Sequence, residues 1–140
     1  MQKWFRIVRR RRRRTSSVTK HYVEHKEATR ALVHSRLQFF NTHYDLVYKR
    51  VAIRNQRRCW GSCSALGNLN FSYRLLFLPP ELSDYIIVHE LCHIKELNHS
   101  QRFWDLVGET IPDYKARKKA IQKYDHIHSS KLIIVSKTLI

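Results

Sequence analysis

The sequence has little of what small secreted scaffolds and membrane proteins depend on. Its 140 residues include three cysteines, three glycines and three prolines. So few cysteines, in an odd number, argue against a disulfide framework and favour a reducing compartment. No apolar run approaches the roughly 18–20 residues that cross a bilayer, and the basic start lacks the apolar segment of a secretory signal. We therefore expect a cytoplasmic protein that does not enter a membrane.

Acidic residues are also scarce relative to basic ones. Eleven Asp and Glu accompany 27 Lys and Arg, and the formal net charge is +16. Six of these charges lie in the arginine run 9–14, so a net charge of +10 remains outside it. Such a field attracts polyanions, although it can also serve solubility alone. DNA or RNA is therefore a candidate partner of the basic surface, while the oligomeric state stays open.

Composition divides the chain into three parts. Residues 1–20 are dominated by Arg, Lys, Ser and Thr, and we expect them to form a disordered basic arm. Residues 21–125 carry the periodic apolar pattern of a single folded domain. Residues 126–140 form a C-terminal tail with an apolar centre, which is either an added strand or a loose end.

Apolar periodicity predicts a helix followed by strands in the first half of the domain. A helix is expected at 22–41. Strands are expected at 46–53, at 57–62 and at 68–75, where polar and apolar residues alternate almost perfectly.

Helices are expected in the second half. Pro79 and Pro80 should end the last strand and begin a helix that runs to residue 97. Asn98 can end that helix in a left-handed cap, and Ser100 can cap a short helix through 106. A final basic helix is expected at 111–124.

The helix beginning at residue 80 carries HELCH at 89–93. His89 and His93 are four residues apart, so both imidazoles project from one face and can reach one tetrahedral ion at roughly 2.0–2.1 Å. Glu90 points beside such an ion and can act as a base toward a water. Buried groups of these kinds are costly unless they are hydrogen-bonded, paired or bound to metal. In a chain of this composition, chance would produce the H-E-x-x-H pattern roughly 0.02 times.

A catalytic zinc has three protein ligands and one open position. His99 is the expected third ligand, because the chain turns at Asn98 and can fold it back. Glu96 and Glu109 are weaker candidates, since the first tends outward and the second lies beyond the next helix. The alternative to a metal site is an amphipathic helix with two exposed or hydrogen-bonded histidines.

Three blocks of sequence together resemble one family. They are RRCWGSCSALGNLNFSYRL at 57–75, DYIIVHELCH at 84–93 and NHSQRFW at 98–104. They resemble the YgjP-like metallopeptidases, which are related to the SprT-like zinc proteases, and the resemblance covers about residues 22–124. It implies an α+β, zincin-like domain in which a short antiparallel sheet packs on helices and the central helix carries HExxH.

The same resemblance implies roles for particular residues. It carries over His89, His93 and His99 as ligands of one Zn²⁺ per chain, and Glu90 as the catalytic acid and base. Trp60, Gly61 and Arg74 are candidates to line the site, and Tyr85 is a further candidate to bind substrate.

We interpret the chain as a zinc metallopeptidase that hydrolyses a protein or peptide through a metal-activated water, with Glu90 as general base and then acid. The strand at 68–73 is expected to lie at a sheet edge and align an extended substrate. Tyr73, Arg74 and Tyr85 are candidates to stabilise the oxyanion.

Two alternatives come from other classes of protein. A metal-dependent endoribonuclease is the first, because H-x3-H-x5-H resembles the bacterial endoribonucleases of ribosomal RNA maturation. That family, however, has Gly at the position of Glu90 and lacks the W-G-S-C block. A non-catalytic nucleic-acid-binding module is the second, and charge alone supports it. A peptidase recruited to nucleic acid by its basic surface combines these ideas.

Overall fold

The computed structural model describes residues 17–56 and 58–128. Its elements in chain order are α1 (Ser17–Tyr44), β1 (Arg50–Arg54), β2 (Gly61–Cys63), β3 (Asn68–Ser72), the 3₁₀ helix η1 (Tyr73–Phe77), α2 (Pro80–Cys92), α3 (Gln101–Gly108) and α4 (Tyr114–His128). The predicted α+β class is confirmed. Most of the expected arm, residues 1–16, and most of the expected tail, residues 129–140, lie outside the described residues.

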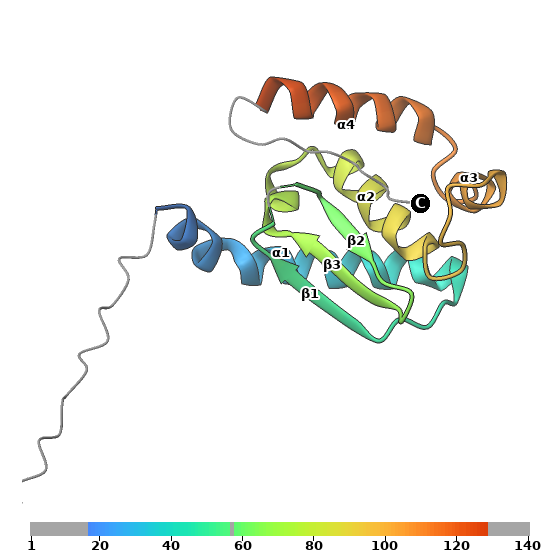
Figure 1. Cartoon of the computed structure of the whole chain (residues 1–140), viewed down its shortest axis with the longest axis horizontal. Coiled ribbons are helices and arrows are strands. Elements are labelled where there is room, and N and C mark those ends of the chain that lie inside the picture. Colours follow the sequence, from blue (N-terminus) through green and yellow to red (C-terminus); the bar gives the residue numbers. More distant parts are fainter. Residues whose placement is uncertain (1–16, 57, 129–140) are drawn as a thin grey trace, which may run out of the picture.

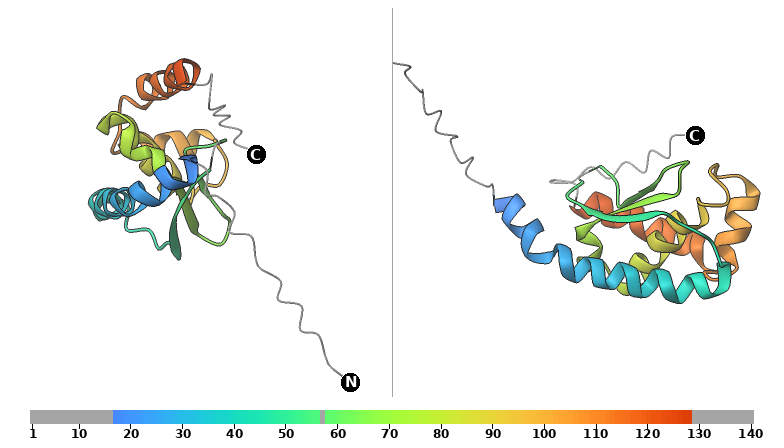
Figure 2. Two further views of the ribbon diagram at one scale, coloured as in Figure 1. Left: turned by 90° about the vertical axis from the view of Figure 1, so that its left-hand side faces the viewer. Right: turned by 90° about the horizontal axis from the view of Figure 1, so that it is seen from below.

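Helix α2 lies at the centre of the domain. It contacts α1, α3, α4 and strand β2, and it passes between α1 and α4 (Figures 1 and 2). Ile86, Ile87, Val88 and Leu91 are all buried, although they point in different directions around the helix. A helix that is apolar on all sides must be covered on all sides. None of the helices in the described part of the chain is long and apolar enough to cross a membrane.

The sheet is mixed, whereas an antiparallel sheet was expected. Strand order is β1–β3–β2, with β3 parallel to β1 (Val51 opposite Leu69) and antiparallel to β2 (Ser62 opposite Asn70). The three strands alternate in direction along the chain, but β3 inserts between the first two, so β1 and β3 run the same way. The expectation that residues 68–73 form a sheet edge is therefore wrong, because β3 is paired on both sides.

The two outer edges of the sheet differ. At β1 the hydroxyl of Tyr22, from α1, donates a hydrogen bond to the carbonyl oxygen of Ile53 at 3.0 Å. At β2 the neighbouring element is α2, which contacts the strand from one side (Figure 1). Helix α1 thus shields part of the β1 edge, and β2 runs next to the helix that carries the histidines.

The predicted elements are present with shifted boundaries. The strands expected at 46–53, 57–62 and 68–75 correspond to β1, β2 and β3. The terminal helices expected at 22–41 and 111–124 correspond to α1 and α4.

Strand β3 ends earlier than its alternating pattern predicts. Ser72 is extended, and its hydroxyl accepts a hydrogen bond from the main-chain N–H of Arg74 at 3.3 Å. This cap turns the chain into η1, although the residues that follow continue the polar–apolar alternation.

Helix α2 also ends earlier than predicted, at Cys92 instead of residue 97. Nδ1 of His93 lies 2.9 Å from the carbonyl oxygen of Glu96, and this bond closes a turn directly after the helix. The expected left-handed cap at Asn98 is wrong, because Asp45 is the sole described non-glycine residue with a positive φ. Ser100 does precede α3, but its side chain makes no cap hydrogen bond.

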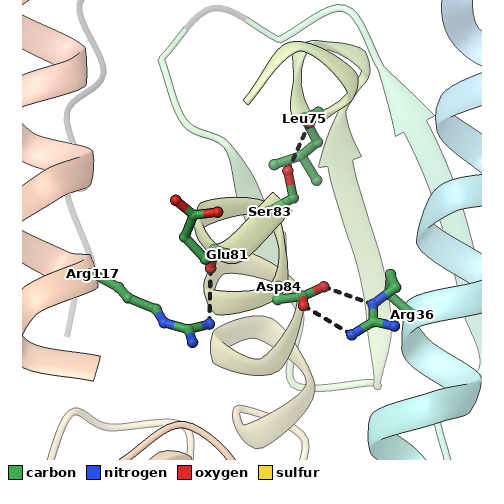
Figure 3. A network of polar contacts seen from close by, with 6 residues as sticks. All are labelled: Arg36, Leu75, Glu81, Ser83, Asp84 and Arg117. Carbon is green, nitrogen blue, oxygen red and sulfur yellow. Dashed lines mark hydrogen bonds and ion pairs between the residues drawn. The ribbon is translucent and has the colours of Figure 1, made fainter. Parts of the chain in front are cut away.

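Polar contacts tie the first half of α2 to three neighbours (Figure 3). Arg36 of α1 donates two hydrogen bonds to the Asp84 carboxylate, at 2.7 and 2.9 Å. Ser83 donates from Oγ to the carbonyl oxygen of Leu75 in η1 at 2.8 Å. Arg117 of α4 donates from Nη1 to the carbonyl oxygen of Glu81 at 3.1 Å. These bonds fix the rotation of α2 and therefore the direction of the side chains near its end.

Asp84→Asn is expected to lower the free energy of unfolding by about 1–2 kcal/mol, because it breaks a bidentate, partly buried ion pair. Urea unfolding measures the loss. Glu27→Gln, which breaks the exposed pair with Arg30 on α1, is the control and should cost less than about 0.5 kcal/mol. Equal losses in the two variants would contradict a special role for the Asp84 pair.

Candidate metal centre

Three histidines converge at the end of α2. Nε2 of His89 lies 3.1 Å from Nε2 of His93, one helical turn further on, and 3.1 Å from Nε2 of His99 in the loop before α3. The ligand atoms of the three residues all lie within 4.8 Å of one another. Two nitrogens bound to one tetrahedral zinc at 2.0–2.1 Å are about 3.3 Å apart. The donor set therefore fits a single ion.

Aromatic side chains of α3 form a wall beside the histidines. The Phe103 ring stacks on His93 with centroids 4.4 Å apart, and the Trp104 ring stacks on His99 at 5.6 Å. Phe103 is fully buried. The short turn after α2 and the packing of these two rings together hold His99 against the helix.

Hydrogen bonds orient two of the rings. The Glu96 carbonyl oxygen can only accept, so the proton of neutral His93 lies on Nδ1 and the lone pair on Nε2 is free to bind metal. On the other ligand, Nδ1 of His89 lies 3.4 Å from the hydroxyl oxygen of Tyr85, one turn earlier on α2. Each contact turns Nε2 toward the common point.

Burial keeps the three imidazoles neutral. It is the largest cause that lowers the pKa of His93, and it lowers the pKa of His99 to about 4. Burial is also the largest cause that holds the pKa of His89 well below its ordinary value. The charges of His93, His99 and Lys118 lower this pKa further. Neutral imidazole is the form that binds metal, so the ligands need no deprotonation at pH 7.

Glu90 lies next to His89 on α2 but outside the group of converging ligand atoms. Its side chain is buried, and burial raises the pKa of the carboxyl group to about 8 from an ordinary value of 4.5. Strand β2 covers it: a Cβ added to Gly61 would come within 2.8 Å of Cγ and 3.2 Å of Oε1 of Glu90. Position 61 therefore has no room for a side chain while the carboxyl group stays where it is.

Among the described strands none pairs with the outer edge of β2, the strand whose Gly61 lies against this carboxyl group. The carbonyl oxygen of Trp60 accepts from Ser72 at 2.8 Å, and the N–H of Ser64 donates to Asn68 at 3.0 Å. In an antiparallel pair, such hydrogen-bonded residues alternate with residues that direct their main-chain N–H and C=O groups to the other side. Gly61 and Cys63 consequently direct theirs away from β3.

The structure places the other predicted site residues differently. Tyr85 contacts a ligand histidine, whereas Trp60 is buried in the core, 6.3 Å from the Tyr124 ring. Arg74 donates to the Gln56 carbonyl oxygen at 3.2 Å.

The weaker ligand candidates are not in the converging group. Glu109 is 2.8 Å from His43, and Glu96 bonds His93 through its main chain. Sequence reasoning named Gly61 as a site-lining candidate but missed its contact with Glu90, and it missed the stacking role of Trp104. The stacking of Trp104 did have a signal in the sequence, namely the aromatic pair Phe103 and Trp104 closely following His99.

Comparisons with known proteins agree with this geometry. The family model of the YgjP-like metallopeptidase domain matches residues 6–124. The crystal structure of the metallopeptidase zymogen of Pyrococcus abyssi abylysin has a TM-score of 0.60 and 26% sequence identity, and the match covers 66% of this chain and 93% of that one. No curated protein matches the chain.

Glu90→Gln is expected to stabilise the metal-free protein increasingly as the pH rises from 5 to 8. The pKa of Glu90 is raised in the folded state, so its contribution to stability is complete below about 4.5 and is lost as the pH rises through about 8. The variant should gain about 3 kcal/mol over wild type at pH 7.

Urea unfolding in the presence of a chelator, at pH values from 5 to 8, measures this gain. Glu24→Gln, at an exposed position of α1, is the control and should show no such trend. A gain that does not change with pH would contradict the buried, protonated state of Glu90.

Proposed function

The chain belongs to the YgjP-like metallopeptidase family, and on this premise we propose that it is a zinc-dependent peptidase with one ion held by His89, His93 and His99. The observation that carries the proposal is the convergence of three neutral imidazole nitrogens beside a buried carboxyl group. A set of three imidazoles suits zinc better than the oxygen-preferring ions. Zinc in such a site polarises the scissile carbonyl and lowers the pKa of a water toward about 7.

Glu90 moves the proton in this proposal. Its carboxylate accepts a proton from the attacking water, and its carboxylic acid then donates a proton to the leaving amine nitrogen. Burial raises the pKa of Glu90 in the metal-free site, which favours the protonated state of the second step, and the charge of a bound ion would lower this pKa toward the carboxylate that the first step needs. Because Gly61 has no side chain, strand β2 can lie directly against the carboxyl group.

Strand β2 is the edge that we assign to substrate alignment, in place of β3. The outward N–H and C=O groups of Gly61 and Cys63 can pair with an extended peptide as an added strand. Since Gly61 lies directly over Glu90, a peptide paired there has its main chain next to the proton-transferring group. Contacts through the main chain alone give affinity with little preference for substrate sequence.

The two rival functions lose support at this site. Family and structural neighbour are metallopeptidases, which disfavours an endoribonuclease. A purely structural zinc site needs no carboxyl group buried beside its ligands, which disfavours a binding module without activity. We also propose a reducing compartment such as the cytoplasm, because Cys59, Cys63 and Cys92 are free thiols.

Metal content and casein cleavage, measured on the same samples, test the proposed function. Wild type should contain one zinc per chain and cleave casein. Glu90→Gln should keep the zinc and lose at least about 100-fold in cleavage rate, because it cannot accept the proton. His99→Ala should lose both zinc and activity.

His34→Ala, at an exposed position of α1, is the matched histidine control and should keep both properties. A protein that folds without binding supplied zinc would contradict the metal site. Zinc bound without proteolysis, together with RNA cleavage that Glu90→Gln abolishes, would support the nuclease instead.

We further propose that the basic surface recruits the enzyme to nucleic acid. Lys115, Lys119 and Lys123 follow one exposed ridge of α4, and within the described residues none of them has an ion-pair partner. Lysines that are not neutralised by the protein can displace counterions from phosphates. The ridge lies on the helix that packs against α2 (Figure 1), so bound nucleic acid would lie near the peptidase site.

Affinity for a DNA duplex is expected to fall steeply with salt, and the triple change of Lys115, Lys119 and Lys123 to Gln should lower the slope of log Kd against log salt by up to about 2.7. Fluorescence anisotropy at several salt concentrations measures both proteins. Affinity that is undetectable, or that does not depend on salt, would remove the recruitment proposal while leaving the peptidase proposal intact.

A further inference from the structure

Lys118 of α4 reaches toward the metal centre through an aromatic side chain. Its Nζ atom lies 4.6 Å from the centre of the Trp104 ring. Trp104 stacks on His99, with centroids 5.6 Å apart, and on Tyr114 at 5.2 Å. Lysine, tryptophan and ligand histidine thus form a continuous series of contacts from α4 to the metal centre.

Lys118 differs from its neighbour in its ionic partners. Arg117, the preceding residue, is paired with Asp113 at 3.0 Å. Among the described residues, in contrast, no carboxylate forms an ion pair with Lys118.

Lys118 is exposed beside the candidate metal centre, so its ammonium group is available to a ligand that arrives from solvent. A lysine ammonium and a divalent ion repel each other, and the repulsion grows as the site is desolvated. An anionic group lying between them would convert this repulsion into two attractions. Lysine is a compact point charge on a flexible stem, so it can follow an anion that is presented beside the Trp104 ring.

We propose that Lys118 and Trp104 form a subsite for a carboxylate of the peptide substrate close to the scissile bond. The carboxylate is an acidic side chain or the free C-terminus of the substrate, two sources of one chemistry. Lys118 binds the charge, and the ring of Trp104 packs on the adjacent apolar atoms. This inference rests on the proposed peptidase function and assigns the substrate preference of the peptidase to Lys118 and Trp104.

Cleavage of matched peptides by the zinc-loaded protein tests the subsite. A mixed library first identifies a cleaved sequence, and mass spectrometry reads the residues around the cut. Peptides with Glu or Gln at each flanking position, and with a free or amidated C-terminus, then separate the two sources. Wild type should favour one carboxylate by at least tenfold in kcat/KM.

Lys118→Glu should reverse this preference toward a basic residue at the same position, and Lys118→Arg should retain it. Lys49→Glu, the same charge reversal at an exposed lysine before β1, should cleave as wild type does. An unchanged preference in Lys118→Glu would overturn the subsite. Loss of nucleic-acid affinity in Lys118→Glu with unchanged peptide preference would also overturn it and place Lys118 on the nucleic-acid surface.

A binding measurement separates failure of the subsite from failure of the proposed function. Zinc-loaded Glu90→Gln and the zinc-loaded double variant Glu90→Gln/Lys118→Gln are each titrated with an acidic peptide and with the same peptide in which an amide replaces the carboxylate. Tighter binding of the acidic peptide, lost on removing Lys118, supports the subsite even if wild type cleaves no peptide. Equal affinities for the two peptides overturn the subsite, whereas absence of peptide cleavage counts against the proposed function.

Discussion

Burial of α2 is the constraint on which the rest of the structure depends. The helix is apolar on several sides, so α1, α3, α4 and β2 must all cover it. The same burial removes water from His89 and Glu90, which lowers the pKa of the imidazole and raises the pKa of the carboxyl group. Packing and site chemistry therefore have one cause, because the environment that stabilises the helix also sets the protonation of its functional groups.

The two ends of α2 contribute differently to the site. Its first half is held by side chains from α1 and α4 and by a bond to η1. Its last turn carries His89 and Glu90, and the chain then bends and brings His99 back toward His89. Because α2 is held firmly at its start and ends at Cys92, the chain can turn and place the three donor nitrogens around one point. A longer helix would carry the following residues away from His89.

The features of this fold that depend on local sequence patterns could be predicted from the sequence. The four-residue spacing of His89 and His93 requires only that a helix form there, and the periodicity of that segment indicated one. The order of the strands was missed, because alternation along a strand says nothing about which strand lies at the centre. Contacts distant in sequence were missed for the same reason: Gly61 meets Glu90, and Lys118 meets Trp104, through packing that no local pattern encodes.

The contrast between the two sheet edges has a consequence for self-association. An exposed strand edge is ordinarily an aggregation hazard, because any extended segment can pair with it. Here the Tyr22 hydroxyl donates to a carbonyl oxygen of β1, while Gly61 of β2 lies against Glu90. Under the proposed function, an extended chain that adds to β2 would lie next to the hydrolytic group, so the peptidase would cleave a partner that could otherwise begin an aggregate.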